Sequence, residues 1–362
     1  MPEPSTSIEP QVPPLRIHHS KRRMIIFAVL GFIVFAAISL IGAYHWSLSP
    51  KDSQSTSKIR VIVEPGETVV DIARQLKEAD LIKSETTFRI YSILTNTKDR
   101  LQAGAYALSK NLSVADIIDH MSTGRTDEFS VFIAPGLTLK QQYDTALNGS
   151  LAQQGFTDAE ITAAFNKSYT SNVLAKKPAG MSLEGYIYPD TYRMTADSDL
   201  SVIIQKSLDE FGRVIQENAI EQKLASRGLT LHQGMTLASI VQKEASDPQD
   251  QKQVAQVFYS RLAADIPLGS DVTFIYAAHL LGVKPTISLD SPYNTRLYKG
   301  LPPGPIANFN LSALLAVATP AEGDYLYFVA GTDGVTHYAH TLAEHNANVQ
   351  KYNSASRTEF SY

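Results

Sequence analysis

The chain has 362 residues, which is enough for two or three folded domains. Its net charge of -4 shows no basic bias, so the composition gives no indication of nucleic-acid binding. The absence of cysteine excludes disulfides, thiol nucleophiles and cysteine metal sites, and it leaves the redox compartment open. Charged residues make up 19% and apolar residues 44%, proportions typical of a folded protein.

The N-terminal part of the sequence predicts a tail followed by a membrane span. Residues 1–23 are rich in proline and serine and end in a basic cluster, which predicts a disordered cytoplasmic tail. Residues 24–46 form an uncharged apolar run, and one helix of about 20 residues suffices to cross a bilayer. Tyr44 and Trp46 stand where interfacial aromatic residues are common.

A cleaved signal peptide is the alternative interpretation of this run. The run is longer than the apolar region of a signal peptide, and residues 47–49 (Ser-Leu-Ser) form only a weak cleavage site. We therefore predict a single-pass transmembrane helix. Because the basic cluster precedes it, the N-terminus should be cytoplasmic and residues 47 onward should lie outside.

A small module is predicted after a polar linker over residues 47–58. The module covers residues 59–125, and its first helix should be capped by Thr68, with Asp71 three residues later. The predicted elements are a strand ending at Pro65-Gly66, helices from Thr68 to Leu76 and over about 85–94, a strand over 103–108, and a helix over 113–121. The opening resembles a LysM-type sugar-binding module. A spacer that binds nothing is an equally open alternative.

A larger domain is predicted over residues 126–355, with a hinge near 123–130 and a C-terminal tail over 356–362. Both domains should be α+β, because strand and helix patterns are mixed throughout. The predicted elements are a strand ending before Pro135-Gly136, helices around 138–146, 158–168, 199–226, 235–245 and 254–262, a buried strand over 324–330, and a closing helix over 341–352. Residues 291–308 are dense in proline and glycine, which predicts a shaped loop.

Glu244 is the first candidate for chemistry. Leu237, Ile240, Val241 and Glu244 share one helical face, and the helix should end near Ser246. An apolar pocket and the negative end of the helix dipole should both raise the pKa of this carboxyl. A protonated carboxyl near neutral pH suits a general acid. The alternative is a structural glutamate whose side chain reaches water at the helix end.

Other signals in the chain are weaker. The sequence has no G-x-S-x-G, H-E-x-x-H, P-loop or G-x-G-x-x-G motif. His337, His340 and His345 match no standard metal-ligand spacing, so we predict no metal or cofactor and ordinary histidines. Arg261 shares an apolar helical face, where it could pair locally with a carboxylate such as Asp247 or Asp250.

Several segments together resemble the MltG (YceG-like) family of membrane-anchored endolytic murein transglycosylases. They occur in the family's order, and the resemblance as a whole covers the chain from the membrane span to near the C-terminus. The segments are Leu237–Glu244, Leu183–Tyr192, Ser291–Thr295, Lys299–Asn308, Asp324–Val329 and Thr341–Asn346. The long proline- and glycine-rich loop over residues 291–308, which contains two of these segments, is the most specific piece.

The resemblance implies a reaction and a location. The family's catalytic acid matches Glu244, which would protonate the glycosidic oxygen of a MurNAc–GlcNAc bond and then deprotonate the C6 hydroxyl of the same MurNAc. A 1,6-anhydroMurNAc end would result, in nascent glycan strands near the inner membrane. The expected substrate-binding residues are Tyr293, Asn294, Asp271, Arg261 and Tyr188. For each of these, bracing of a loop is the alternative role.

The sequence departs from the family pattern at three positions. Gln242 replaces a frequent second glutamate, Ser260 replaces an asparagine, and Val272 replaces a proline. The loss of the second acid leaves Glu244 as the carboxylate that matches the family's catalyst. The other two departures concern substrate geometry rather than reaction class.

Two other functions stay open, a peptidoglycan-binding scaffold without activity and a water-using muramidase with Asp271 or Asp190 as second carboxylate. The expected partners are peptidoglycan glycan strands and the membrane, with peptidoglycan synthases acting beside the enzyme, and no nucleic acid.

Overall fold

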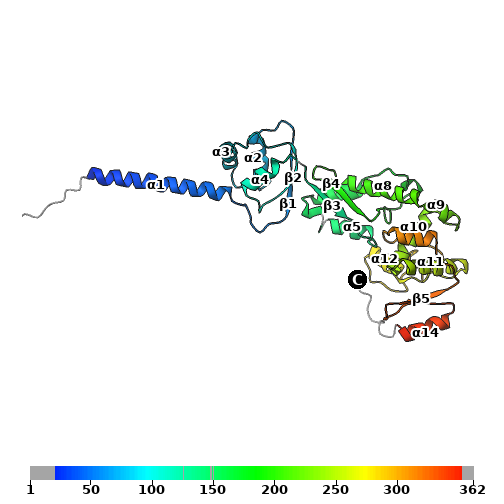
Figure 1. Ribbon diagram of the computed structural model, residues 1–362. Coiled ribbons are helices and arrows are strands. Elements are labelled where there is room, and N and C mark those ends of the chain that lie inside the picture. The colour runs from blue at the N-terminus through cyan, green and yellow to red at the C-terminus, as the bar shows by residue number, and fades with distance from the viewer. Residues whose placement is uncertain (1–20, 125, 147–148, 150, 353–362) are drawn as a thin grey trace, which may run out of the picture. The chain divides into compact units, whose positions relative to one another are not determined.

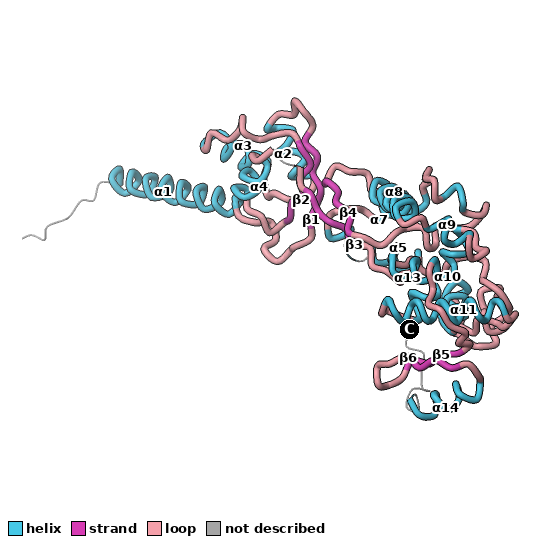
Figure 2. The backbone as a smooth tube through the Cα atoms, turned by 45° about the vertical axis from the view of Figure 1, so that its right-hand side comes forward, coloured by secondary structure: helices cyan, strands magenta, loops and turns pink. Residues whose placement is uncertain are grey.

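The computed structural model describes residues 21–124, 126–146, 149 and 151–352. Most of the predicted tail over 1–23, and all of the C-terminal tail over 356–362, lie outside the described residues. The chain divides into two compact units. Unit 1 contains residues 1–55, 67–102 and 110–123, and unit 2 contains residues 56–66, 103–109 and 124–362. The α+β class predicted from the sequence is confirmed by the mixed helices and strands (Figures 1 and 2).

Unit 1 contains one long apolar helix and three short amphipathic helices. They are α1 (Lys21–Leu48), α2 (Val69–Glu78), α3 (Glu85–Leu94) and α4 (Val114–Met121). Residues 23–48 of α1 contain an 18-residue stretch with a mean hydropathy of 2.9 and are long and apolar enough to cross a membrane. The predicted cap of α2 is confirmed, because Thr68 and Asp71 form a reciprocal capping box. Ser113 and Asp116 cap α4 in the same way.

The core of unit 1 is built from the apolar faces of the three short helices. Ile72 and Leu76 of α2, Phe88 of α3 and Ile117 of α4 are all at most 2% exposed. The loop between α2 and α3 adds Leu81 and Ile82, which are buried equally well. Each face follows the helical period in the sequence, so these helices were predictable from their apolar spacing.

Unit 2 contains three two-stranded antiparallel sheets. They are β1 (Lys58–Val63) with β2 (Gly104–Ser109), β3 (Glu128–Phe132) with β4 (Thr191–Thr195), and β5 (Tyr327–Ala330) with β6 (Thr336–Ala339). Val61 lies opposite Tyr106, Val131 opposite Tyr192, and Val329 opposite His337. Asp127 connects two of the sheets, because its N–H donates to Ala105 O and its carbonyl accepts from Ala196 N–H.

Helices make up most of unit 2. They are α5 (Leu139–Thr145), α6 (Leu151–Gln153), α7 (Asp158–Asn166), the 3-10 turn η2 (Leu174–Lys176), α8 (Ser201–Glu217), α9 (Ile220–Ala225), α10 (Leu231–Glu244), α11 (Pro248–Ala263), α12 (Asp271–Leu281), α13 (Leu311–Ala318) and α14 (Leu342–Tyr352). The short apolar helix α13 packs against both α10 and α11 and buries Leu314 and Val317 between them. At the other end, α14 packs on β5 and β6 (Figure 2).

Three details of the sequence prediction for unit 2 are wrong. The predicted buried strand over 324–330 is shorter, since β5 begins at Tyr327, and it is only partly buried. The predicted helix over 199–226 is divided into α8 and α9, because Ala219 adopts a positive φ of 50°. Helix α12 and strands β4 and β6 were not predicted from the sequence. Strand β4 pairs with β3, which is distant in the chain.

Candidate active site around Glu244

Glu244 is the last residue of α10, and the chain leaves the helix at Ala245 in an extended conformation. Leu237, Ile240 and Val241, which share its helical face, are fully buried. The Glu244 side chain is half-buried at the end of that face. The predicted orientation of the stripe is therefore confirmed, and the carboxyl lies at the boundary between the core and solvent.

Ser270 holds the carboxyl in place. Its Oγ donates a hydrogen bond to Glu244 Oε1. Ser270 is only 4% exposed and occupies the N-cap position of α12, where its side chain makes no capping bond. Its N–H donates to Thr295 Oγ1 at 3.2 Å, and its carbonyl accepts from Thr273 Oγ1 at 2.6 Å. The proline- and glycine-rich loop thus fixes the hydroxyl that orients Glu244.

The surroundings raise the pKa of Glu244 above its ordinary value. Burial is the largest cause, and the negative charge of Asp271 acts in the same direction. The Ser270 hydrogen bond and the positive charges of Arg296 and Arg261 oppose the rise. Glu244 therefore keeps its proton to a higher pH than an exposed glutamate, as the sequence argument expected for a general acid.

Asp271 and Arg296 form an ion pair beside this carboxyl, through Arg296 Nε and Asp271 Oδ1. Both side chains are about two-fifths exposed, so the pair borders the solvent side of the site. Asp271 is the first residue of α12, whereas Arg296 lies in the proline- and glycine-rich loop, directly after Thr295. The structure therefore brings predicted Asp271 close to Glu244 and adds Arg296, which the sequence reasoning had not selected.

Arg261 contributes positive charge and braces the surrounding backbone. Its guanidinium donates to the carbonyls of Leu326 at 2.6 Å, Leu268 at 2.7 Å and Pro267 at 3.2 Å. It also lies over the ring of Tyr327, 5.0 Å from the centroid.

The alternative of a local ion pair between Arg261 and Asp247 or Asp250 is wrong. Asp247 caps α11 by accepting from Gln249 N–H and Asp250 N–H. The Asp250 carboxylate accepts from Thr336 Oγ1 at 2.8 Å and Tyr338 Oη at 3.2 Å. Both carboxylates therefore serve local structure.

Tyr293 and Asn294 lie in the same loop but differ in accessibility. Asn294 is fully buried, donates to the carbonyls of Ile287 and Leu289 at 3.0 and 2.8 Å, and accepts from Arg296 N–H. Its side-chain hydrogen bonds are therefore made with the backbone of the loop and of the residues just before it. Tyr293 is half-buried, and its ring stands edge-on to Tyr276 with centroids 5.0 Å apart.

Tyr188 lies in the core of unit 2. It is 8% exposed and stacks on Phe211, with ring centroids 5.4 Å apart. Its carbonyl accepts from Tyr192 Oη and Ser207 Oγ. None of its described contacts involves Glu244 or the residues around that carboxyl. Substrate binding stays a prediction for all five residues, and the geometry supports it best for Asp271 and Tyr293.

Glu184 is a second buried carboxyl that the sequence reasoning did not select. It is 7% exposed, and its carboxyl oxygens accept from Leu139 N–H at 2.9 Å and Tyr276 Oη at 3.2 Å. Burial raises its pKa to about 7, although these hydrogen bonds oppose the rise. Burial raises the pKa of Tyr293, and the charge of Glu184 raises it further. Its position between Leu183 and Gly185, in an otherwise apolar and aromatic segment, could have identified Glu184 as a candidate from the sequence.

Gln242 holds the start of α13. Its Oε1 accepts a hydrogen bond from Asn310 N–H at 3.0 Å. One turn earlier on α10, Ser239 Oγ accepts from Ile306 N–H at 3.0 Å. The proline- and glycine-rich loop is therefore attached directly to the helix that carries Glu244. Asn308 extends this attachment, because its side chain joins Leu137 N–H and Ala134 O.

The three C-terminal histidines make separate contacts in the described part of the chain. His337 pairs with Asp333 at 3.0 Å, and His340 pairs with Asp324 at 3.0 Å. His345 stacks on Tyr327, with centroids 5.4 Å apart. His345 therefore contacts the ring that covers Arg261.

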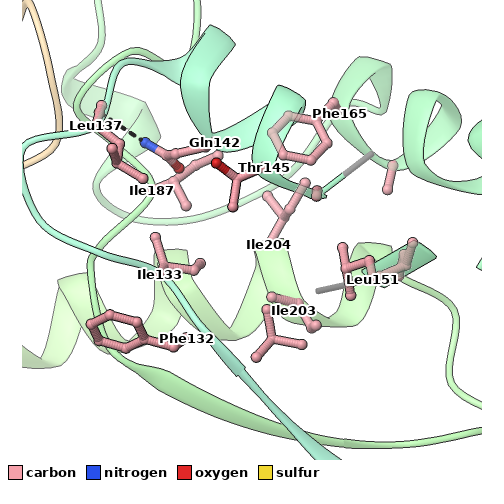
Figure 3. A pocket seen from close by; sticks show the side chains of 14 residues that line it. Phe132, Ile133, Leu137, Gln142, Thr145, Leu151, Phe165, Ile187, Ile203 and Ile204 are labelled. Carbon is pink, nitrogen blue, oxygen red and sulfur yellow. Dashed lines mark hydrogen bonds between the residues drawn. The ribbon is translucent and has the colours of Figure 1, made fainter. Parts of the chain in front are cut away.

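An apolar cavity lies elsewhere in unit 2, between β3, α5 and α8 (Figure 3). Its lining includes Ile133, Leu137, Ile187 and Ile204 and does not include Glu244. Gln142 faces it and donates to Leu137 O at 3.2 Å. The cavity holds only about 50 Å³, so a sugar does not fit.

Comparison with known proteins places the chain in a family. The YceG-like family model matches residues 61–351. A protein of Streptococcus pneumoniae serotype 2, named endolytic murein transglycosylase, is 31% identical over 90% of this chain. This chain spans 65% of the length of that relative. A Bacillus subtilis protein of the same name is 32% identical, with 85% of this chain and 88% of the relative covered.

A solved structure agrees with this assignment. The crystal structure of a YceG-like protein from Listeria monocytogenes superimposes with a TM-score of 0.53 and 30% identity. The match covers 81% of this chain and 99% of that chain. Because the family model covers most of the sequence and the fold agrees, this chain belongs to the YceG-like family.

Proposed function

We propose that this chain is a membrane-anchored endolytic murein transglycosylase with Glu244 as its acid and base. The observation that supports this most directly is the half-buried Glu244 carboxyl, whose pKa is raised and which Ser270 orients. Two relatives that are 31% and 32% identical are named endolytic murein transglycosylases. In the proposed reaction, the substrate is the glycan strand of peptidoglycan.

The reaction needs one carboxyl group in two protonation states. Protonated Glu244 donates its proton to the glycosidic oxygen as the bond between MurNAc C1 and the leaving GlcNAc breaks. The Glu244 carboxylate then accepts the proton of the C6 hydroxyl of the same MurNAc, and that oxygen bonds to C1. The products are a 1,6-anhydroMurNAc end and a new GlcNAc end, and Glu244 is protonated again. Since the nucleophile belongs to the substrate, no positioned water is required.

The neighbours of Glu244 suit this cycle. Arg296 and Arg261 stabilise the carboxylate formed after the first step, and Ser270 donates to it. Asp271 disfavours the ionised form, which helps to restore the proton. The opposing influences fit a group that must release a proton and then recover it.

A water-using muramidase is the second candidate, because Asp271 lies close enough to Glu244 to influence its charge. In that reaction Asp271 would activate water or attack the sugar. Asp190, the other carboxylate considered, accepts a hydrogen bond from the N–H of Thr191 at the start of β4. None of the described contacts of Asp190 involves Glu244, so Asp271 is the better candidate for a second carboxylate.

The proposed location follows from α1. This helix would cross the bilayer, with the basic residues before it in the cytoplasm and residues 47 onward outside. The enzyme would then cut nascent strands near the inner membrane and limit their elongation. Action beside peptidoglycan synthases is part of the same proposal, as is glycan binding by the predicted LysM-like module over 59–125.

The deciding experiment is digestion of purified sacculi with the full chain in detergent, followed by mass spectrometry of the glycan ends. We expect anhydroMurNAc ends from internal cuts, and a loss of at least about 100-fold in Glu244→Gln, which keeps the shape but cannot transfer the proton. Glu217→Gln is the matched control, because Glu217 also ends a helix but is 56% exposed and paired with Arg213.

The product ends separate the functions. Reducing MurNAc ends that depend on Glu244 and Asp271 would establish the muramidase instead. Binding to sacculi without new ends, by a folded protein, would contradict the enzyme proposal and favour the scaffold function.

A further inference from the structure

Helix α3 presents an apolar stripe to its surroundings. Ile90 is 43% exposed, Ile93 60% and Leu94 72%, although the three lie three and four positions apart on one helical face. The opposite face of α3 is buried, with Phe88 and Ser92 both at 0% exposure. Among the described residues of unit 1 outside α1, these three are the large apolar side chains that are exposed.

The start of α3 is fixed to the end of α1. Ser47 Oγ, near the end of α1, donates to Thr87 Oγ1 in the first turn of α3 at 2.9 Å. Lys83 lies just before α3, and its ammonium donates to Trp46 O at 3.0 Å and lies 4.4 Å from the centre of the Trp46 ring. Both helices belong to unit 1, and Figure 1 shows α3 beside the end of α1.

This attachment decides what the stripe can meet. If α1 crosses a bilayer, as the proposed function requires, Trp46 lies at the outer interface, where tryptophan is enriched. A helix of ten residues is only about 15 Å long, so all of α3 stays close to that interface. The region of headgroups and upper acyl chains accepts apolar side chains from helices to a depth of about 5–10 Å.

We propose that the exposed stripe of α3 (Ile90, Ile93 and Leu94) lies in the outer surface of the same bilayer that α1 crosses. Arg89 shares the exposed face and would reach the lipid phosphates. Lys83, at the junction with α1, adds a second positive charge near anionic headgroups. The bilayer is favoured over a protein partner because the stripe is continuous with the end of the spanning helix.

The consequence is a two-point attachment of unit 1. A spanning helix alone leaves the extracellular segment free to swing about its end. A second contact through α3 would restrict that motion and hold the three short helices of unit 1 at the membrane surface. This inference rests on the proposed membrane anchoring but not on the chemistry of Glu244, so the two can fail separately.

The absence of cysteine makes the test direct. Single variants Ile93→Cys and Leu94→Cys of the full chain are spin-labelled and reconstituted in vesicles that contain anionic phospholipid. Collision with oxygen and with a water-soluble nickel chelate reports the depth of each label. Ile33→Cys in α1 serves as the reference for a label inside the bilayer, and Asp119→Cys, exposed on α4, serves as the reference for a label in water.

We expect the labels at Ile93 and Leu94 to be shielded from the nickel chelate and accessible to oxygen, at a depth between the two references. Aqueous labels at both positions, with Ile33 deep in the bilayer, would overturn the inference and leave the anchor intact. Aqueous labels at all positions would overturn the anchor as well. Spin–spin broadening at Ile93 with water accessibility would show a contact between copies instead and would also contradict the inference.

A second variant keeps the test independent of the label. Replacement of Ile90, Ile93 and Leu94 by serine affects exposed positions, so the fold should persist, which circular dichroism checks. In that background a label at Thr86, which is exposed one turn earlier on α3, should gain access to the nickel chelate by several-fold. The Thr86 label should be shielded from the nickel chelate in the native background. If its accessibility is the same in the triple-serine variant, the stripe does not hold α3 to the membrane.

Discussion

Ser270 donates to Glu244 from a position where a serine hydroxyl ordinarily caps its own helix. The Ser270 side chain makes no capping hydrogen bond to α12. Its hydroxyl instead orients a carboxyl that lies 26 residues earlier in the sequence. Two contacts fix Ser270, one from its N–H to Thr295 of the loop and one to its carbonyl from Thr273 of α12. The bond is therefore part of a braced arrangement, and the properties of Glu244 should respond to changes at this junction.

Removal of the hydroxyl should change the pH dependence of activity. The proposed acid is active when protonated, so kcat/KM should fall as pH rises through the pKa of Glu244. Ser270→Ala removes a hydrogen bond that favours the ionised form of Glu244, so the pKa of Glu244 rises. The alkaline limb of the pH profile, where kcat/KM falls, should therefore move to higher pH. The pH profile of sacculus digestion measures this shift, and a limb that moves to lower pH would contradict the assigned role.

Removal of the neighbouring charge should have the opposite effect. Asp271→Asn deletes a negative charge that raises the pKa of Glu244 and frees Arg296, whose charge lowers it. The alkaline limb should therefore move to lower pH, with cleavage retained and anhydro ends unchanged. Loss of cleavage in this variant, together with reducing MurNAc ends from the native enzyme, would instead support Asp271 as the second carboxylate of a muramidase.

Glu184 should make the protein less stable at high pH. Its pKa is about 7 in the folded protein, compared with an ordinary 4.5. Between these values the folded state binds more protons than the unfolded state, so the free energy of unfolding falls as pH rises from about 5 to 8. The shift corresponds to roughly 3 kcal/mol. Glu184→Gln should remove this loss, as measured by urea unfolding at pH 5 and pH 8, whereas exposed Glu217→Gln should keep it.

Gly185 should tolerate no side chain. It has a φ of 78°, and a Cβ there would overlap the ring of Pro305. Gly180 has nearly the same φ of 79° but open space around it, so Gly180→Ala isolates the cost of the backbone conformation. We expect Gly185→Ala to cost about 1–3 kcal/mol more than Gly180→Ala in urea unfolding, because of overpacking. Equal losses would show that Pro305 moves aside freely.

Gln242 should be replaceable by the glutamate that is frequent in the family. A carboxylate oxygen at this position can accept the same hydrogen bond from Asn310 N–H. We therefore expect Gln242→Glu to retain both stability and cleavage, whereas Gln242→Ala should cost about 1–3 kcal/mol, because the N–H loses its partner. Thermal unfolding and sacculus digestion of the two variants test this expectation.

Local patterns were sufficient for the helices of unit 1 and for the orientation of Glu244. The spacing of Leu237, Ile240 and Val241 placed the carboxyl at the end of a buried face, and all three are fully buried. The cap at Thr68 was visible because its partner lies three residues away. Such features depend on neighbours in the sequence, so no knowledge of the tertiary fold was needed to predict them.

The sequence alone determined the apolar span and the α+β class, because each depends on composition or on spacing within single elements. It also determined the choice of Glu244, where the helical spacing was joined by the resemblance of several segments to one family. Only the tertiary structure decided which groups tune that carboxyl. Ser270 and Arg296 reach it from 26 and 52 positions away, and Glu184 is buried by α5 and Tyr276, which lie far from it in the chain. A pKa depends on the charges and hydrogen bonds that surround a group in space, and chain folding brings these together in a way that no local pattern records.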